Sequence, residues 1–217
     1  MKIMKIFKRA AMGFGILIMV LIVARYVYMK EIGNFHEVSK GMVYRSAQLD
    51  RDQLLEYMNK YGIKSILNLR GKKEDKQWYK DEMEVAGTKG VVIVSFRLSP
   101  EKIIPPSVIA EIIDLMKKAP KPILVHCKAG ADRSGLVAAV WKLAVEKLPP
   151  KEAHKQLSLY NGHVPYLWSK TKAMDESFWN YVSYLRSQKQ SEKDAQLRHR
   201  IYCLTTATQM ACSLPLL

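Results

Sequence analysis

Short hydrophobic runs alternate with amphipathic stretches along most of the chain. Three runs rich in β-branched residues are typical of buried strands and cover residues 63–70, 91–98 and 121–127. Between and after them, apolar residues recur at helical spacing, as on the face formed by Ile109, Ile112, Ile113 and Met116. Because strands that alternate with helices are typical of α/β domains, the pattern predicts an α/β fold.

The expected helices have recognisable start and stop signals. Asp50 and Gln53 form the sequence pattern of a capping box, and Gly62 lies beyond the end of that helix. Pro106 suits the first turn of another helix, and an Asn-Gly pair ends the last one. The expected helices cover residues 50–60, 73–88, 106–118, 134–147 and 151–160.

Residues 1–30 follow a different pattern, because residues 10–24 form an apolar run without a charge. At about 1.5 Å of rise per residue this run is shorter than a membrane core of about 30 Å. A span through Met29 is long enough if the Arg25 side chain reaches the interface. The segment therefore predicts a single membrane-anchor helix.

A cleaved signal peptide is the alternative interpretation, because a basic start and a short apolar core fit it as well. Cleavage after Ala24 would favour a small residue two positions earlier, but Ile22 occupies that position. We therefore expect an uncleaved anchor. Four basic residues precede the apolar run, Lys2, Lys5, Lys8 and Arg9, against Arg25 and Lys30 after it. This asymmetry predicts a cytoplasmic N-terminus and a remainder on the exported, periplasmic side.

The most specific motif is HCKAGADRSG at residues 126–135. Five residues separate Cys127 from Arg133, and such a loop between a strand and a helix can turn its backbone N–H groups inward around an anion. A guanidinium can bind two phosphate oxygens at once, and the same positive field favours a cysteine thiolate nucleophile. Gly130 and Gly135 suit unusual dihedrals and a close ligand. The alternative is a buried structural cysteine beside a surface arginine.

This motif, together with VYRSAQL near residue 45 and IKSILNLRG at 63–71, resembles the dual-specificity branch of the protein tyrosine phosphatase superfamily, in particular its bacterial and atypical Siw-type members. The resemblance spans about residues 41–167. It implies a central, mostly parallel sheet with helices on both faces, a phosphocysteine intermediate, no metal and no cofactor.

Residue roles are carried over from the resemblance by position. Cys127 is the expected nucleophile, Arg133 the phosphate clamp and Ser134 the hydroxyl that eases thiolate departure. His126 is expected to position the loop and tune the thiol. The expected substrate-binding residues are Lys128, Ala129, Gly130, Ala131 and Gly135 of the loop, with Arg70 and Arg97 at the ends of two strands.

The general acid is the point at which the sequence departs from the family pattern. The usual aspartate ahead of the nucleophile strand is missing from the stretch FRLSPEKIIPPS. Asp132 is one candidate, because some phosphoinositide phosphatases of the superfamily carry an aspartate directly before the clamp arginine. Glu101 is the alternative. Asp132 could equally brace the loop, and Glu101 could simply be solvated.

Composition limits the remaining possibilities. The chain carries 35 basic and 20 acidic residues, and without residues 1–30 the rest is still at +9. This charge suits phosphorylated substrates and anionic surfaces, whereas no nucleic-acid reader motif accompanies it. Arg45, Arg70 and Arg97 are either surface charges or part of a pocket rim, and three cysteines exclude a disulfide framework. A lone thiolate is vulnerable to oxidation on the exported side.

The expected organisation is an anchor at 1–30, a phosphatase domain at 31–188 and a tail at 189–217 that is polar, then apolar, and either helical or disordered. The expected function is hydrolysis of phosphate monoesters on phosphotyrosine or other phosphorylated protein residues. Phosphoinositide, inositol phosphate or lipid-linked phosphate substrates are the alternative. A rhodanese-like sulfurtransferase and a noncatalytic phosphate-binding module fit the motif less well. His154 and His163 lack metal-ligand spacing and are expected to be structural or at the surface.

Overall fold

The centre of the protein is a five-stranded sheet. The computed structural model describes residues 2–166 and 169–205. The strands are β1 (His36–Ser39), β2 (Val43–Ser46), β3 (Ser65–Asn68), β4 (Val92–Ser95) and β5 (Ile123–His126), in the spatial order β1-β2-β5-β3-β4. Only β1 is antiparallel to its neighbour, so the sheet is mostly parallel, as expected. The central position of β5 places its carboxyl end in the middle of one sheet edge.

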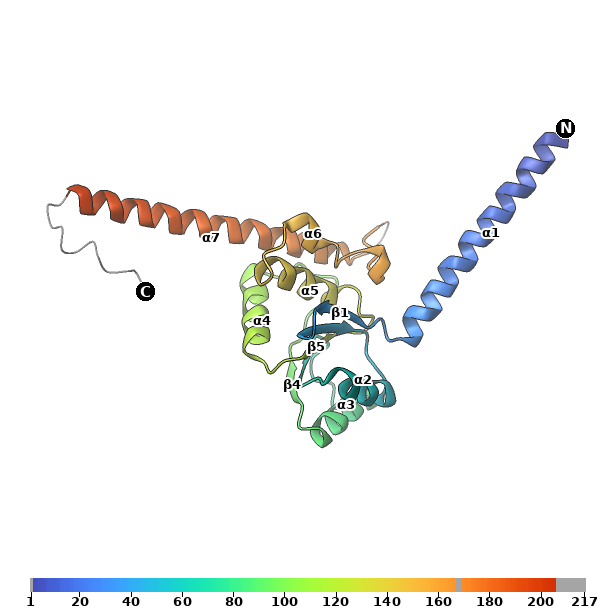
Figure 1. Ribbon diagram of the computed structural model, residues 1–217, viewed down its shortest axis with the longest axis horizontal. Helices are drawn as coiled ribbons and strands as arrows, with labels where there is room; N and C mark the ends of the chain where they lie inside the picture. The colour runs from blue at the N-terminus through green and yellow to red at the C-terminus, as the bar shows by residue number, and fades with distance from the viewer. Residues whose placement is uncertain (1, 167–168, 206–217) are drawn as a thin grey trace.

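Helices cover both faces of this sheet (Figure 1). The described helices are α1 (Lys2–Glu31), α2 (Arg51–Tyr61), α3 (Gln77–Thr88), α4 (Pro106–Lys118), α5 (Arg133–Ala144), α6 (Pro150–His154) and α7 (Lys172–Thr205), with a 3₁₀ turn at Leu159–Asn161, and all but α1 pack on the domain. Helices α2 and α3 pack on one face, and α5 lies between the other face and α4, α6 and α7. The expected α/β fold is confirmed.

Alternation along the strands explains the two cores. Leu67, Ile123 and Val125 point into the core under α4, α5 and α7, whereas Ile66 and Leu124 point into the core under α2 and α3. Successive side chains of a strand face opposite sides of a sheet. A strand buried on both sides therefore has a continuous apolar sequence, which is the pattern that the chain displays.

The helix expected at residues 151–160 is wrong in its second half. Helix α6 ends at His154, and the chain then turns through the 3₁₀ segment. Two side chains explain this end. Asn161 donates from Nδ2 to the carbonyls of Lys155 and Gln156, and Arg45 donates from Nη1 to the Gln156 carbonyl. These side-chain donors satisfy carbonyls that a continuing helix would pair with its own backbone N–H groups.

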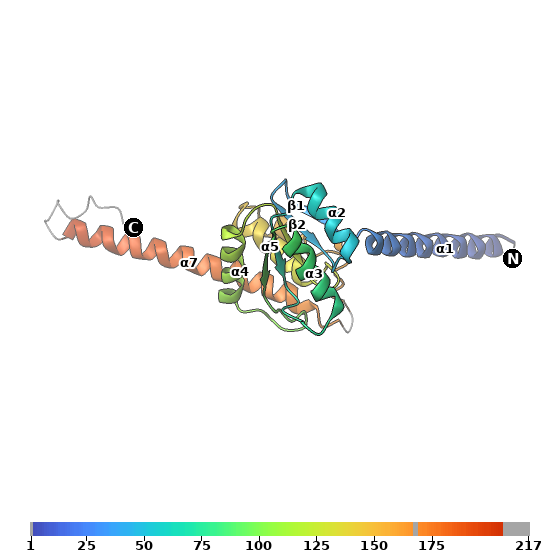
Figure 2. The same ribbon diagram turned by 90° about the horizontal axis from the view of Figure 1, so that it is seen from below.

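Two long helices extend away from the domain (Figures 1 and 2). Residues 7–31 of α1 are apolar and long enough to cross a membrane, and they are almost entirely exposed. The first half of α7 packs on the core through Phe178 and Val182, and its second half is exposed through Arg200. The part of the tail at 189–205 is thus helical, while residues 206–217 lie outside the described residues.

Candidate active site

The HCKAGADRSG motif forms the connection between the central strand β5 and helix α5. His126 is the last residue of β5, and Arg133 is the first residue of α5. The loop therefore lies at the carboxyl end of the sheet and at the N-terminus of a helix, where backbone N–H groups and the helix dipole favour an anion. Cys127 is almost completely buried at its base. The structure thus gives the motif the strand-loop-helix setting that its chemistry requires.

The Cys127 thiol has a hydroxyl partner in the following helix. The Sγ atom lies 3.4 Å from Ser134 Oγ, and both residues are buried. A hydroxyl at this distance can donate a hydrogen bond to a thiolate. Ser134 is therefore placed to stabilise negative charge on the sulfur.

His126 is paired with a carboxylate that the sequence did not single out. His126 Nε2 lies 3.0 Å from Glu82 Oε2, and both side chains are buried. Burial raises the pKa of Glu82, but His126 and hydrogen bonds from Gln48 and Asn68 outweigh this effect and lower it. Glu82 lies on the buried face of α3, three residues after Tyr79 and three before Val85. This helical spacing within the expected 73–88 helix is the one sequence signal that could have identified it.

Arg45 lies beneath the loop rather than at the pocket rim that the sequence allowed. Its side chain is fully buried, and Nη2 donates to the carbonyls of Gly130 at 2.7 Å and Ala131 at 3.3 Å. Burial lowers the pKa of Arg45 to about 10, although electrostatic interactions with Cys127 and Asp132 act to raise it. The sequence could not reveal this role, because its partners lie more than eighty positions away.

Gly130 allows the loop to pass close to strand β2. Its φ is +69°, and a Cβ atom there would lie 2.4 Å from the backbone nitrogen of Ala47. Gly135, in contrast, packs within α5 against Leu157 and the Arg45 guanidinium. The structure thus places Gly130 in the loop and Gly135 in the helix behind it.

Arg133 is anchored at the ends of two strands. Its Nη1 atom donates to the carbonyls of Leu69 and Leu98, at 3.2 and 3.3 Å. These contacts orient the guanidinium beside a cavity of about 600 Å³. Nine described residues line this cavity: Arg70, Lys73, Arg97, Leu98, Ser99, Pro100, Lys102, Lys128 and Arg133. Six of them are basic and none is acidic, so the cavity suits an anionic ligand.

Three expected substrate-binding residues, Arg70, Arg97 and Lys128, meet at this cavity. Arg70 stacks on Trp78 with 3.6 Å between the guanidinium carbon and the ring centroid, and it donates to Gln48 Oε1 at 3.0 Å. Partial burial, followed by repulsion from Arg133, lowers the pKa of Arg70. Arg97 is exposed at the rim.

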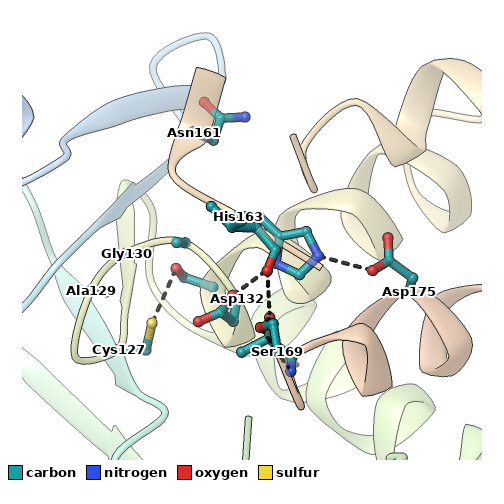
Figure 3. Close-up of polar contacts among 12 residues, drawn as sticks. Cys127, Ala129, Gly130, Asp132, Asn161, His163, Ser169 and Asp175 are labelled. Atoms are coloured by element: carbon teal, nitrogen blue, oxygen red, sulfur yellow. Dashed lines mark hydrogen bonds and ion pairs between the residues drawn. The ribbon is translucent and has the colours of Figure 1, made fainter. Parts of the chain in front are cut away.

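Asp132 is held by a buried histidine (Figure 3). His163 donates from Nδ1 to Asp132 Oδ1 at 2.7 Å and from Nε2 to Asp175 Oδ2 at 2.9 Å, and Asp175 Oδ1 also lies 2.8 Å from His154. Burial opposes charge on His163, but its contacts with Asp132 and Asp175 outweigh this effect and raise its pKa to about 9. His163 is therefore cationic at neutral pH, and Asp132 retains one fifth of its side-chain surface exposed.

Glu101, the other candidate acid, lies in a more open position. Its side chain is 57% exposed, and Oε2 is 3.7 Å from Lys170 Nζ. It is not among the described residues that line the basic cavity.

A family model described as "DSP-PTPase phosphatase fused to NAD+ Kinase" matches residues 24–197. The match covers most of the chain, including the whole sheet and the loop. The chain belongs to this family. It is thus a member of the dual-specificity phosphatases, whose chemistry is hydrolysis of phosphate esters. The resemblance drawn from the motif is confirmed.

Solved structures share the fold of this phosphatase at low identity. A cysteine-to-serine variant of TpbA from P. aeruginosa in complex with phosphotyrosine has a TM-score of 0.53 and 19% identity, covering 69% of this chain and 91% of that chain. The core catalytic domain of the PP-IP phosphatase SIW14 from S. cerevisiae also has a TM-score of 0.53 and 19% identity, covering 72% and 93%. A putative phosphatase from Shewanella putrefaciens has a TM-score of 0.52 and 17% identity, covering 68% and 92%.

No curated protein sequence matches the phosphatase significantly. Within the described residues, no group of three histidine, cysteine, aspartate or glutamate side chains has a geometry that could hold a metal ion.

Proposed function

We propose that this protein hydrolyses phosphate monoesters through a phosphocysteine on Cys127. The observation that carries the proposal is the buried Cys127 thiol, 3.4 Å from the Ser134 hydroxyl, in the motif whose Lys128 and Arg133 line the basic cavity. Backbone N–H groups and a helix N-terminus stabilise the phosphate dianion and the charge that develops in the transition state.

The first step forms a sulfur–phosphorus bond as the bond between phosphorus and the leaving oxygen breaks. The Cys127 thiolate supplies the electron pair, and a general acid protonates the leaving oxygen. Arg133 binds two equatorial phosphate oxygens in a bidentate manner. In the second step, water attacks phosphorus and gives a proton to the carboxylate that acted as the acid, and the sulfur–phosphorus bond breaks to release inorganic phosphate. Ser134 stabilises the departing thiolate.

Asp132 is the proposed general acid, and Glu101 is the alternative. Asp132 directly precedes Arg133, is partly exposed, and has one carboxylate oxygen fixed by His163. A cation at this contact favours an ionised carboxylate, so the support for the acid role is the position of Asp132 beside Arg133. Glu101 is more exposed and pairs with Lys170, so its position is less constrained.

The proposed substrates are phosphotyrosine and other phosphorylated residues of proteins. The TpbA variant of related fold has been solved in complex with phosphotyrosine, which supports this class of substrate. Phosphoinositides, inositol phosphates or lipid-linked phosphates are the second candidate class. The observation that favours them is the cavity itself, where six basic side chains exceed the need of a single phosphate.

A substrate panel tests the proposal. Wild type and Cys127→Ser are assayed on an aryl phosphate, phosphotyrosine peptides and soluble inositol phosphates, each with and without EDTA. We expect turnover by wild type alone, unaffected by EDTA, and retained phosphate binding by Cys127→Ser because the loop and Arg133 remain. Full activity of Cys127→Ser, or activity that EDTA removes and a divalent metal restores, would contradict the mechanism. The ratio of peptide to inositol phosphate turnover decides between the substrate classes.

A further inference from the structure

Asn34 lies at the junction between helix α1 and the catalytic domain. Its backbone N–H donates to the carbonyl of Met29 at 2.6 Å, so it closes the last turn of α1. Its side chain is buried in the domain, and its φ is +46°. Asparagine tolerates this left-handed conformation better than most residues with a side chain.

The side-chain amide of Asn34 reaches the phosphate-binding loop. Nδ2 donates to the carbonyl of Ala129 and to that of Asn161, each at 3.0 Å. Oδ1 lies 2.8 Å from His36 Nε2, which donates to it because a carbonyl oxygen can only accept. Both amide hydrogens and the oxygen thus have partners, which fixes the orientation of the group.

Asn34 completes a set of donors around the loop. The carbonyl of Lys128 accepts from the backbone N–H of Gln48 at 3.3 Å, and those of Gly130 and Ala131 accept from Arg45. With Asn34 on Ala129, every carbonyl from residue 128 to residue 131 is held from outside the loop.

The geometry of the peptide bond links these contacts to catalysis. In a planar trans peptide, the carbonyl of one residue and the N–H of the next point in opposite directions. A donor that holds the Ala129 carbonyl on the outside therefore turns the Gly130 N–H toward the anion site. Gly130, with its φ of +69°, has the conformational freedom to be held in this way.

We propose that Asn34 is a positioning residue for the phosphate-binding loop and that it couples the loop to the end of helix α1. The inference rests on the proposed phosphatase function. Asparagine meets two requirements together: the left-handed backbone favours it, and its amide supplies two donors. Aspartate lacks the donors, and glycine lacks the side chain.

The test compares full-length wild type in detergent with Asn34→Gly and Ser65→Ala. Asn34→Gly keeps the backbone conformation but deletes the amide. Ser65→Ala is a matched control, because the buried Ser65 hydroxyl also donates a hydrogen bond to a backbone carbonyl, that of Pro120, at the opposite end of β3 from the loop. Inorganic phosphate is the probe, measured as a competitive inhibitor of aryl phosphate hydrolysis, and thermal unfolding reports the fold.

We expect folded Asn34→Gly to bind phosphate about tenfold more weakly and to lose at least that factor in kcat/KM, because a misdirected loop N–H costs much of one oxyanion contact. Ser65→Ala should lower thermal stability while phosphate affinity stays at the wild-type value. A folded Asn34→Gly with wild-type phosphate affinity would overturn the inference. Wild type without phosphatase activity would instead overturn the proposed function.

A second pair of variants decides the matter if Asn34→Gly does not fold. His36→Leu removes the donor that orients the Asn34 amide, whereas His36→Gln places an amide N–H at a similar position. We expect weaker phosphate inhibition in His36→Leu and recovery in His36→Gln. Equal, wild-type phosphate affinity in both would contradict the positioning role.

Discussion

At the scale of single residues, substitution of Asp132 tests whether this carboxylate is the general acid or only braces the phosphate-binding loop. If Asp132 protonates the leaving oxygen, Asp132→Asn should slow hydrolysis of an alkyl phosphate by about a hundredfold or more. An activated aryl phosphate needs little protonation, so much of its rate should remain. Steady-state rates over a series of leaving groups measure this, and the dependence on leaving-group pKa should steepen.

Glu101→Gln is the internal comparison for that experiment. Its side chain is exposed, so the substitution should leave the fold intact. Equal losses on both substrates for Asp132→Asn, together with a selective loss for Glu101→Gln, would assign the acid role to Glu101.

The Arg133 guanidinium provides a second prediction at this scale. Arg133→Lys keeps the positive charge but loses the planar fork that binds two oxygens and the anchoring donors to Leu69 and Leu98. We expect loss of most activity, about a hundredfold in kcat/KM, by analogy with other oxyanion contacts. Rates within a few-fold of wild type would show that charge alone is sufficient.

Residues close together in sequence could be predicted, and residues brought together by folding could not. The spacing of Cys127 and Arg133, with an apolar run before it and a helical pattern after it, was enough to predict the loop and its setting. Glu82, Arg45 and Asn34 reach the loop from other elements, 44 to 95 positions away in the contacts with His126, Gly130 and Ala129, and nothing local to them indicates those partners.

At the scale of elements, the loop requires glycine at position 130. A Cβ there would meet the backbone of strand β2, and the positive φ disfavours any side chain. Gly130→Ala should lower the free energy of unfolding by about 1 kcal/mol or more and impair phosphate binding. Denaturant unfolding measures the first effect and phosphate inhibition the second.

Gly87→Ala is the control for this variant. Gly87 lies in α3, and a Cβ there would meet nothing within 4 Å. We expect an unchanged or higher free energy of unfolding, because alanine favours a helix. If Gly130→Ala has the same free energy of unfolding and the same phosphate inhibition as Gly87→Ala, the close approach of the loop to β2 is contradicted.

The His163 contacts tie the start of α5 to the start of α7 and predict a pH dependence. The pKa of His163 is raised to about 9 from an ordinary value of 6.5, so its stabilising contribution is complete below about pH 6.5. That contribution should fade as the pH rises through about 9. Urea unfolding of wild type should show falling stability over this window, whereas His163→Asn should be less stable at neutral pH and show a flatter profile. If wild type and His163→Asn show the same dependence of stability on pH, groups other than His163 cause it.

Element boundaries set by local signals were predicted well. The capping box of Asp50 and Gln53 is formed, and α4 begins at Pro106 and ends at Lys118. The end of α6 was missed because Arg45 and Asn161, which satisfy its carbonyls, are tertiary contacts. Strands β1 and β2 were not predicted, since their sequences HEVS and VYRS each include a charged residue and lack the continuous apolar run of the three other strands.

At the scale of the whole molecule, we propose that α1 anchors the domain to a membrane with the domain on the exported side. Removal of residues 1–30 should move the phosphatase from the membrane fraction to the soluble fraction. A reporter fused after Leu217 should indicate the exported side. A cytoplasmic signal would contradict the orientation, and a soluble full-length protein would contradict the anchor.

Trapping the covalent intermediate tests the central claim most directly. Wild type and Cys127→Ser are mixed with an activated aryl phosphate and quenched in acid within one turnover, and peptide mass spectrometry locates any phosphoryl group. The account predicts one phosphoryl group on Cys127 in wild type and no turnover by Cys127→Ser. A phosphoryl group on another residue, or turnover by Cys127→Ser at the wild-type rate, would contradict it.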